Sequence, residues 1–186
     1  HMPELRMFTG ASMPRRAASA WAVGLVVLGM NWAVSYALLP EGFLRGKTLA
    51  GLLDPRGGSP AATFVRIGLF NLLFGCGGVV YMNRFRVGRL PAGYAITWIF
   101  WAFYGLLLGT NSFMFSGPAK YAPSFALLWS RSGLFEMSAY TLTAAATARW
   151  RLDPMEGQDA WPSLEEIMAL LLALGLLIFG VWRETR

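Results

Sequence analysis

The chain has 186 residues, of which 55% are hydrophobic and only 14% are charged, and its formal net charge is +6. Soluble domains contain more charged residues, about 25%, and a domain of this length has too small a core to bury so much apolar surface. The composition therefore excludes an ordinary soluble domain and indicates a protein of the lipid bilayer.

Ligands for transition metals are scarce in this sequence. The only histidine is His1, which with Met2 resembles a cloning remnant, so we expect no functional role for it. The only cysteine is Cys76. Zinc, haem and iron–sulfur clusters are held mainly by imidazole and thiolate groups. We expect no metal and no cofactor.

The basic charge does not indicate a nucleic-acid-binding protein. The arginines stand at the ends of apolar segments, where their side chains meet lipid headgroups. The expected partners are the lipid bilayer, other proteins of the cell envelope and a second copy of this chain, and nucleic acid is not among them.

Five apolar segments follow one another along the chain. The first is uncharged and long enough to cross a hydrocarbon core of about 30 Å; it is longer than the apolar part of a signal peptide, so we expect a retained helix. The sequence predicts an all-α, polytopic membrane bundle of about five transmembrane helices. Residues 1–16 form the cloning remnant and a basic N-terminal segment, and a single transmembrane domain covers 17–186, with spans at about 17–39, 65–82, 92–115, 124–147 and 164–182.

The segments between the spans carry their own signals. Residues 40–64 are rich in glycine, proline and charge and predict a loop, with a weak indication of a short helix over 46–53. The short segment 84–91 predicts a tight turn that makes spans two and three antiparallel neighbours. Ser163 is a good N-cap, and Glu165 and Glu166 fall in the first turn of the last helix, where the helix dipole favours carboxylates.

Five spans would place the two termini on opposite sides of the membrane. Three arginines crowd the short turn between spans two and three, namely Arg84, Arg86 and Arg89. Positive charges in short loops favour the cytoplasmic side. We therefore expect a prokaryotic cytoplasmic membrane protein with its N-terminus inside.

Arg131 and Glu136 are ionisable residues within the fourth predicted span. Such residues usually face protein or water, because exposing them to lipid is costly. Arg66 and Asn71 of the second span are candidate partners. Three interpretations stay open: a functional polar site, a structural brace, or a helix that starts near Leu134 and leaves Arg131 at the interface.

Several small and amide side chains indicate close helix packing. Asn71 and Asn111 lie in or near apolar runs, where hydrogen bonds between helices are their commonest role. Glycine lets helix backbones approach closely. We expect spans two and three to pack together at Gly75, Gly78, Gly105 and Gly109.

Catalytic motifs are missing from the sequence. It contains no GxSxG, HExxH, CxxC or Walker-type glycine loop, and all its lysines and aspartates fall in predicted loops. Intramembrane catalysis would depend on Glu136 alone, so the sequence favours a non-catalytic protein.

Residues 65–150 resemble the stage II sporulation protein M family of membrane proteins. The matching elements are Phe70-Asn71-Leu72-Leu73, the glycine-bearing run from Gly105 to Asn111, and Ser132-Gly133-Leu134-Phe135-Glu136 followed by Ala144-Ala145-Ala146. The family often has histidine where Ser132 stands and glycine where Ser112 stands. The resemblance implies site positions at Asn71, Gly133 and Glu136.

The resemblance implies a non-catalytic integral membrane component of envelope machinery, since the named family member works with peptidoglycan-remodelling partners in sporulating bacteria. Two alternatives remain. One is a small channel or transporter whose polar site surrounds Glu136 and Arg131, and the other is an intramembrane enzyme.

Overall fold

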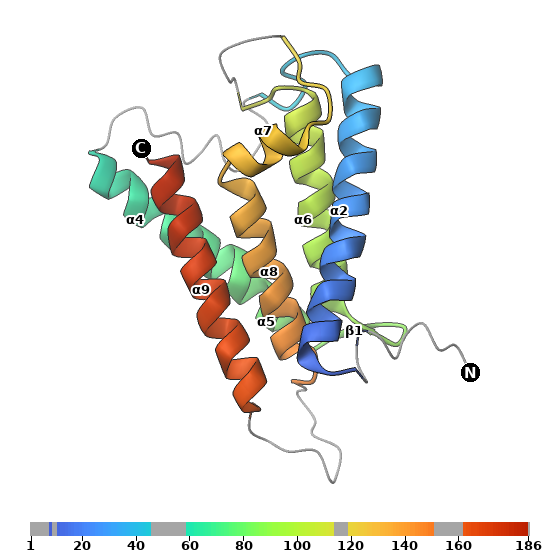
Figure 1. Ribbon diagram of the computed structural model, residues 1–186, viewed down its shortest axis with the longest axis vertical. Coiled ribbons are helices and arrows are strands. Elements are labelled where there is room, and N and C mark those ends of the chain that lie inside the picture. Colours follow the sequence, from blue (N-terminus) through green and yellow to red (C-terminus); the bar gives the residue numbers. More distant parts are fainter. Residues whose placement is uncertain (1–7, 9–10, 46–58, 114–118, 151–161, 186) are drawn as a thin grey trace.

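The computed structural model describes residues 8, 11–45, 59–113, 119–150 and 162–185. Within these ranges the chain is an all-α bundle with one two-stranded antiparallel hairpin (Figure 1). Its elements are α2 (Met13–Leu38), α4 (Pro60–Phe70), the π-helical segment η2 (Asn71–Gly77), α5 (Gly78–Met82), β1 (Arg86–Val87), β2 (Leu90–Pro91), α6 (Ala92–Gly109), α7 (Phe125–Ser130), α8 (Gly133–Thr147) and α9 (Leu164–Glu184). The predicted fold class is confirmed.

The bundle is built around two helix pairs. The most extensive contact joins α2 and α6, which lie side by side, and the next joins α8 and α9. The continuous path α4–η2–α5 runs obliquely across the bundle: α5 packs against α6 and α8, whereas α4 diverges from them beside α9. The start of α2 and the end of α9 lie at opposite ends of the bundle (Figure 1).

Four helical stretches in the described part of the chain are long and apolar enough to cross a membrane: Met13–Leu38, Ala61–Met82, Ala92–Gly109 and Leu164–Glu184. Large apolar side chains cover their outer surfaces, including Met30 on α2 and Leu171 on α9, which are 63% and 59% exposed. Such surfaces are unfavourable in water and suit a lipid environment. The chain is therefore an integral membrane protein.

The fourth predicted span is not one continuous helix. It consists of α7 and α8, separated at Arg131, whose backbone is extended with φ −107° and ψ 157°. At the break the hydroxyl of Ser130 donates to the carbonyl of Leu127 at 2.8 Å, a local bond that competes with helical pairing. The 15 residues of α8 reach only about 22 Å. This replaces the expected span over 124–147 and agrees with the alternative of a helix starting near Leu134.

Two of the other helices begin earlier than the sequence predicted. The first helix starts at Met13 rather than 17, so it includes Arg15 and Arg16. The second helical path starts at Pro60 rather than 65, after Ser59, whose hydroxyl accepts from the amide of Ala62 at 3.2 Å. An apolar run therefore underestimates a helix whose first turn is polar.

The third helix ends at Gly109, before the predicted 115, because Asn111 adopts the left-handed conformation with φ 47°. The amide of Asn111 donates to the carbonyl of Leu108 at 3.1 Å, and the amide of Ser112 donates to that of Leu107 at 3.0 Å. These two bonds form a Schellman motif, which stops a helix.

The connections agree in part with the sequence. The turn predicted over 84–91 holds the hairpin, in which Arg86 pairs with Pro91 and Gly88 has φ 62°. The hydroxyl of Ser163 accepts from the amide of Glu166 while the Glu166 carboxylate accepts from the amide of Ser163, which confirms the N-cap as a full capping box. The short helix expected over 46–53 lies outside the described residues.

Candidate functional site: the carboxyl cluster at the helix break

The break places Glu136 in the first turn of α8, not twelve residues into an apolar span as its position in the run 124–147 suggested. Gly180 of α9 faces this turn. A Cβ atom at position 180 would lie 3.3 Å from Cγ of Glu136 and 3.4 Å from the carbonyl oxygen of Ser132. Glycine therefore lets α9 approach the start of α8, and the carboxyl group is enclosed between the two helices.

Polar groups from four elements surround this carboxyl group. Asn71, Ser132 and Glu184 lie beside the Glu136 carboxyl, and Tyr104 of α6 is within its electrostatic reach. We call Asn71, Tyr104, Ser132, Glu136 and Glu184 the carboxyl cluster. It brings residues that are distant in sequence to one end of the bundle, beside the break between α7 and α8.

Two buried polar atoms of the carboxyl cluster have no hydrogen-bond partner in the described part of the chain: Oε1 of Glu136 and the hydroxyl oxygen of Tyr104. Tyr104 is only 6% exposed. Its ring lies directly over Gly133, so that a Cβ at position 133 would overlap the ring. The missing side chain of Gly133 thus allows the tyrosine to reach the first turn of α8.

The local backbone explains how Asn71 joins this cluster. Asn71 is buried and is the first residue of the π-helical segment η2. A π turn is wider than an α turn, and such turns are frequent at functional sites. Gly75, within the same segment, accommodates the ring of Tyr140 from α8, which holds η2 against the helix that carries Glu136.

The structure brings together three of the residues predicted from the sequence: Asn71, Gly133 and Glu136. Arg131 is half-buried at the break and within electrostatic reach of Tyr104. Arg66 lies on the exposed surface of α4. Asn111 is buried and ends α6 as described above.

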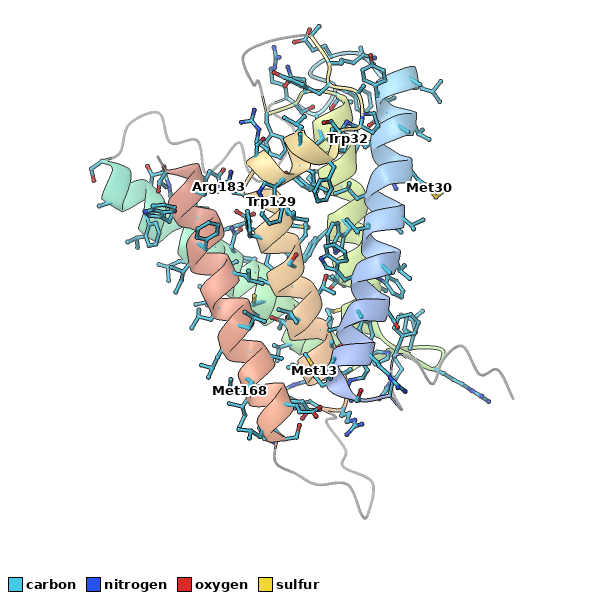
Figure 2. The ribbon with its side chains drawn as sticks, viewed as in Figure 1. Met13, Met30, Trp32, Trp129, Met168 and Arg183 are labelled. Carbon is cyan, nitrogen blue, oxygen red and sulfur yellow. The ribbon has the colours of Figure 1, made fainter. Side chains whose placement is uncertain are left out.

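An arginine and several aromatic rings hold α7 over the end of α9. Arg183 donates to the carbonyl oxygen of Trp129 at 3.0 Å and lies 5.5 Å above the ring of Phe135; Figure 2 shows Arg183 and Trp129 close together. Phe135 also packs edge-on against Phe179 at 4.9 Å. These contacts fix the position of the break beside the carboxyl cluster.

A buried ion pair that was not predicted from the sequence lies at the opposite end of the bundle. Nη2 of Arg16 lies 2.9 Å from Oε1 of Glu166, and the two side chains are 1% and 6% exposed. Glu166 uses its other oxygen in the capping box of α9. The pair joins the first turns of α2 and α9, and Met13 and Met168 accordingly lie at the same end of the bundle in Figure 2.

None of the four glycines predicted to pack spans two and three lies at a contact between those two spans. A Cβ at Gly105 would collide with the carbonyl oxygen of Leu28. A Cβ at Gly109 would lie 2.6 Å from the carbonyl oxygen of Trp32, so both glycines pack against α2. Gly75 meets Tyr140 of α8, and nothing lies within 4 Å of a Cβ at Gly78. The expectation failed because chain neighbours were assumed to form the tightest contact.

Spans two and three do meet at Asn83, just after α5. A Cβ at Gly93 of α6 would overlap the Asn83 side chain. The Asn83 amide nitrogen donates to the carbonyl oxygen of Ala144 at 2.9 Å and to Oγ1 of Thr147 at 2.6 Å. This buried amide links α5 to the end of α8, as expected for amide side chains between membrane helices.

No family model, curated protein or solved structure matches this chain. Among the residues that the structure describes, no three side chains of the histidine, cysteine, aspartate or glutamate type form a group that could hold a metal ion. The fold and the carboxyl cluster therefore define the class of protein: a small polytopic helical membrane protein with a polar site at one end of its bundle.

Proposed function

We propose that this protein is a non-catalytic integral membrane component that works with partner proteins of the cell envelope, as the resemblance to the stage II sporulation protein M family implies. One observation carries the proposal. Of the positions singled out by that resemblance, Asn71 of η2 meets Gly133 and Glu136 of α8 in or against the carboxyl cluster, although 62 residues separate Asn71 from Gly133 in the sequence. Convergence of this kind is expected when a sequence pattern maintains one site.

The surface of α4 and η2 is the best candidate for the contact with a partner helix. This path diverges from α6 and α8 (Figure 1), and it exposes the apolar side chains of Val65, Leu69 and Leu73, which are 55%, 51% and 62% exposed. Since η2 begins at Asn71, a helix docked on this surface would lie next to the carboxyl cluster. The proposal therefore places recognition and the polar site on one element.

A photo-crosslinking residue introduced at Leu69 or Leu73 tests this proposal in cells of the native host. We expect each variant to form a discrete crosslink to one envelope protein, because the partner helix packs against the diverging surface. Gel mobility and mass spectrometry of the affinity-purified product identify the partner.

The matched control is the same residue at Leu171, which is equally exposed on α9 and should crosslink to lipid only. Crosslinks to lipid alone at all three positions would contradict the proposal. Loss of cell growth for Glu136→Gln together with such a result would favour the second candidate, a small channel or transporter, which the polar groups around Glu136 and Arg131 support. A crosslink to the same chain would indicate a homo-oligomer.

We also propose a prokaryotic cytoplasmic membrane with the N-terminus inside. Arg15, Arg84, Arg86 and Arg149 all lie at the end of the bundle where α2 begins and α5 and α8 end, and Tyr94 is within electrostatic reach of both Arg86 and Arg149. Arg16 does not add to this surface, since it is buried with Glu166. A basic end is retained on the cytoplasmic side.

Reporter fusions test this orientation. Alkaline phosphatase, active outside the cytoplasm, should be active when fused after Arg186 and inactive when fused before α2, and a fluorescent protein that folds in the cytoplasm should give the reverse pattern. Activity of the same reporter at both ends would contradict the parallel arrangement of α2 and α9, and a reversed pattern would contradict the orientation alone.

A further inference from the structure

Glu136 and Glu184 bring two carboxyl groups together where the end of α9 lies beside the first turn of α8. Glu184 is at the end of α9, and its carboxyl lies beside that of Glu136. Two adjacent carboxylates repel each other, so a proton or another cation between them stabilises the arrangement. The site therefore binds either a shared proton or another cation.

The unpartnered atoms point to a bound group larger than a proton. The hydroxyl of Tyr104 and Oε1 of Glu136 are both buried and accept or donate no hydrogen bond within the described residues. Buried polar atoms are almost always satisfied, and leaving one unpaired is unfavourable. A proton shared between the carboxyl groups would leave the tyrosine hydroxyl, which belongs to a different helix, unsatisfied.

Oxygen is the ligand atom that every member of the carboxyl cluster can offer. Glu136 and Glu184 supply carboxylates, Asn71 an amide oxygen, and Ser132 and Tyr104 hydroxyl oxygens. Such ligands suit small hard cations and not the transition metals that imidazole and thiolate prefer. The sequence-based expectation of no metal rested on the scarcity of those softer ligands.

The surroundings partly neutralise the two carboxylates, so the site suits a cation of single charge that enters from water. The site lies at the C-terminal end of α9, where the helix dipole is negative, and at the N-terminal end of α8, where the positive dipole stabilises the Glu136 carboxylate. Ion sites in membrane transporters likewise lie at broken helices and helix ends. Glu184 is an exposed residue, which provides the way in. Arg131 near Tyr104 and Arg183 over the ring of Phe135 are the positive groups beside the site, and Tyr140 and Cys76 are further titratable groups nearby.

We propose that the carboxyl cluster binds one small hard cation between the carboxylates of Glu136 and Glu184, with the hydroxyl of Tyr104 as a further ligand. The proposal does not depend on a protein partner or on transport. It requires only that the site can hold the ion in the purified protein.

Thermal unfolding of the full chain in detergent tests the cation site. At constant pH and ionic strength, replacing choline chloride by sodium chloride, or adding magnesium or calcium chloride, should raise the melting temperature by about 5 °C at saturation for the cation that fits. Choline is too large to enter the site. Direct binding of the fitting ion is then measured by isothermal titration calorimetry.

Two substitutions separate ligands from structural groups. Glu184→Gln removes a charge from an exposed helix end and should raise the dissociation constant by at least about tenfold. Tyr104→Phe keeps the ring over Gly133 and removes only the hydroxyl, and should weaken binding by about fivefold. Glu165→Gln, an exposed carboxylate at the other end of α9, is the control and should leave binding unchanged.

The outcomes are distinct. If no cation changes the melting temperature while pH does, the two carboxyl groups share a proton and the proposal is overturned. If a cation stabilises the protein equally in the wild type and in both variants, it acts elsewhere and the proposal is overturned. If only Tyr104→Phe leaves the cation response unchanged, the tyrosine is not a ligand. The unpartnered hydroxyl of Tyr104 would then no longer support the site, and the proposal as stated would be overturned.

Discussion

Replacing Arg16 by methionine should lower the free energy of unfolding by about 3–5 kcal/mol, the larger of the two effects that we expect from single substitutions. The loss arises because the substitution would leave the Glu166 carboxylate, whose side chain is 6% exposed, buried without the cation that now pairs with it. Reversible unfolding in mixed detergent micelles, followed by tryptophan fluorescence or circular dichroism, measures the change.

The neighbouring arginine provides the control. Arg15 is exposed on the same turn of α2, so Arg15→Met should change stability by no more than about 0.5 kcal/mol. Equal destabilisation by the two substitutions would show that the loss comes from the helix terminus in general and not from the ion pair.

The double variant separates pairing from packing. Glu166→Gln keeps a side chain that can complete the capping box with Ser163, and it should destabilise the protein when Arg16 is intact. Combined with Arg16→Met it should recover most of the stability, because a neutral pair leaves no uncompensated buried charge. A double variant as unstable as the sum of the single variants would mean that Arg16 and Glu166 are not coupled.

Much of the bundle could be predicted because a helix that spans the bilayer requires a long apolar run, and such a run is visible in the sequence. The runs at 17–39, 65–82 and 164–182 correspond to α2, to the path ending in α5 and to α9, with differences of a few residues at most ends. The prediction failed at Arg131, where the hydropathy stays high on both sides but serine and glycine residues let the backbone leave the helix.

The ion pair was missed because Arg16 was assigned to the lipid headgroups that flank an apolar run. The pattern that could have found it is the buried stripe of α2, in which Ala20, Gly24, Leu28 and Trp32 recur every four residues. Extending that stripe by one turn toward the N-terminus reaches Arg16. A charged residue on the buried face of a helix needs an opposite charge or a hydrogen-bond partner, even where the hydropathy places that residue at the membrane boundary.

Glu184, which was not singled out from the sequence, is likewise in phase with a buried stripe. Glu166 and Glu184 are 18 residues apart, which is five full turns of an α-helix, so they stand at the two ends of the one stripe that α9 presents to the bundle. Ala173 and Gly180 are buried along that stripe. Periodicity could place Glu184 on the inner face, but only the packing of α9 on α8 shows that Glu136 is opposite.

Gly105→Ala is expected to lower the free energy of unfolding by about 3 kcal/mol, although it adds one methyl group. The new Cβ would collide with the carbonyl oxygen of Leu28 and lie 3.1 Å from the amide nitrogen of Trp32. Both are backbone atoms of α2, so no side-chain rotation relieves the overlap, and the two helices with the most extensive contact in the bundle must separate. Thermal unfolding in detergent measures the loss.

Gly29→Ala is the matched control, because the same methyl group is added to a glycine of α2 that has nothing within 4 Å of its Cβ position. Alanine favours the helical backbone over glycine by up to about 1 kcal/mol, so this variant should be as stable as the wild type or more stable. The two substitutions should thus have effects of opposite sign. A neutral Gly105→Ala would mean that α2 and α6 are farther apart in the membrane than their glycine contact requires, and the arrangement of the whole bundle would have to be revised.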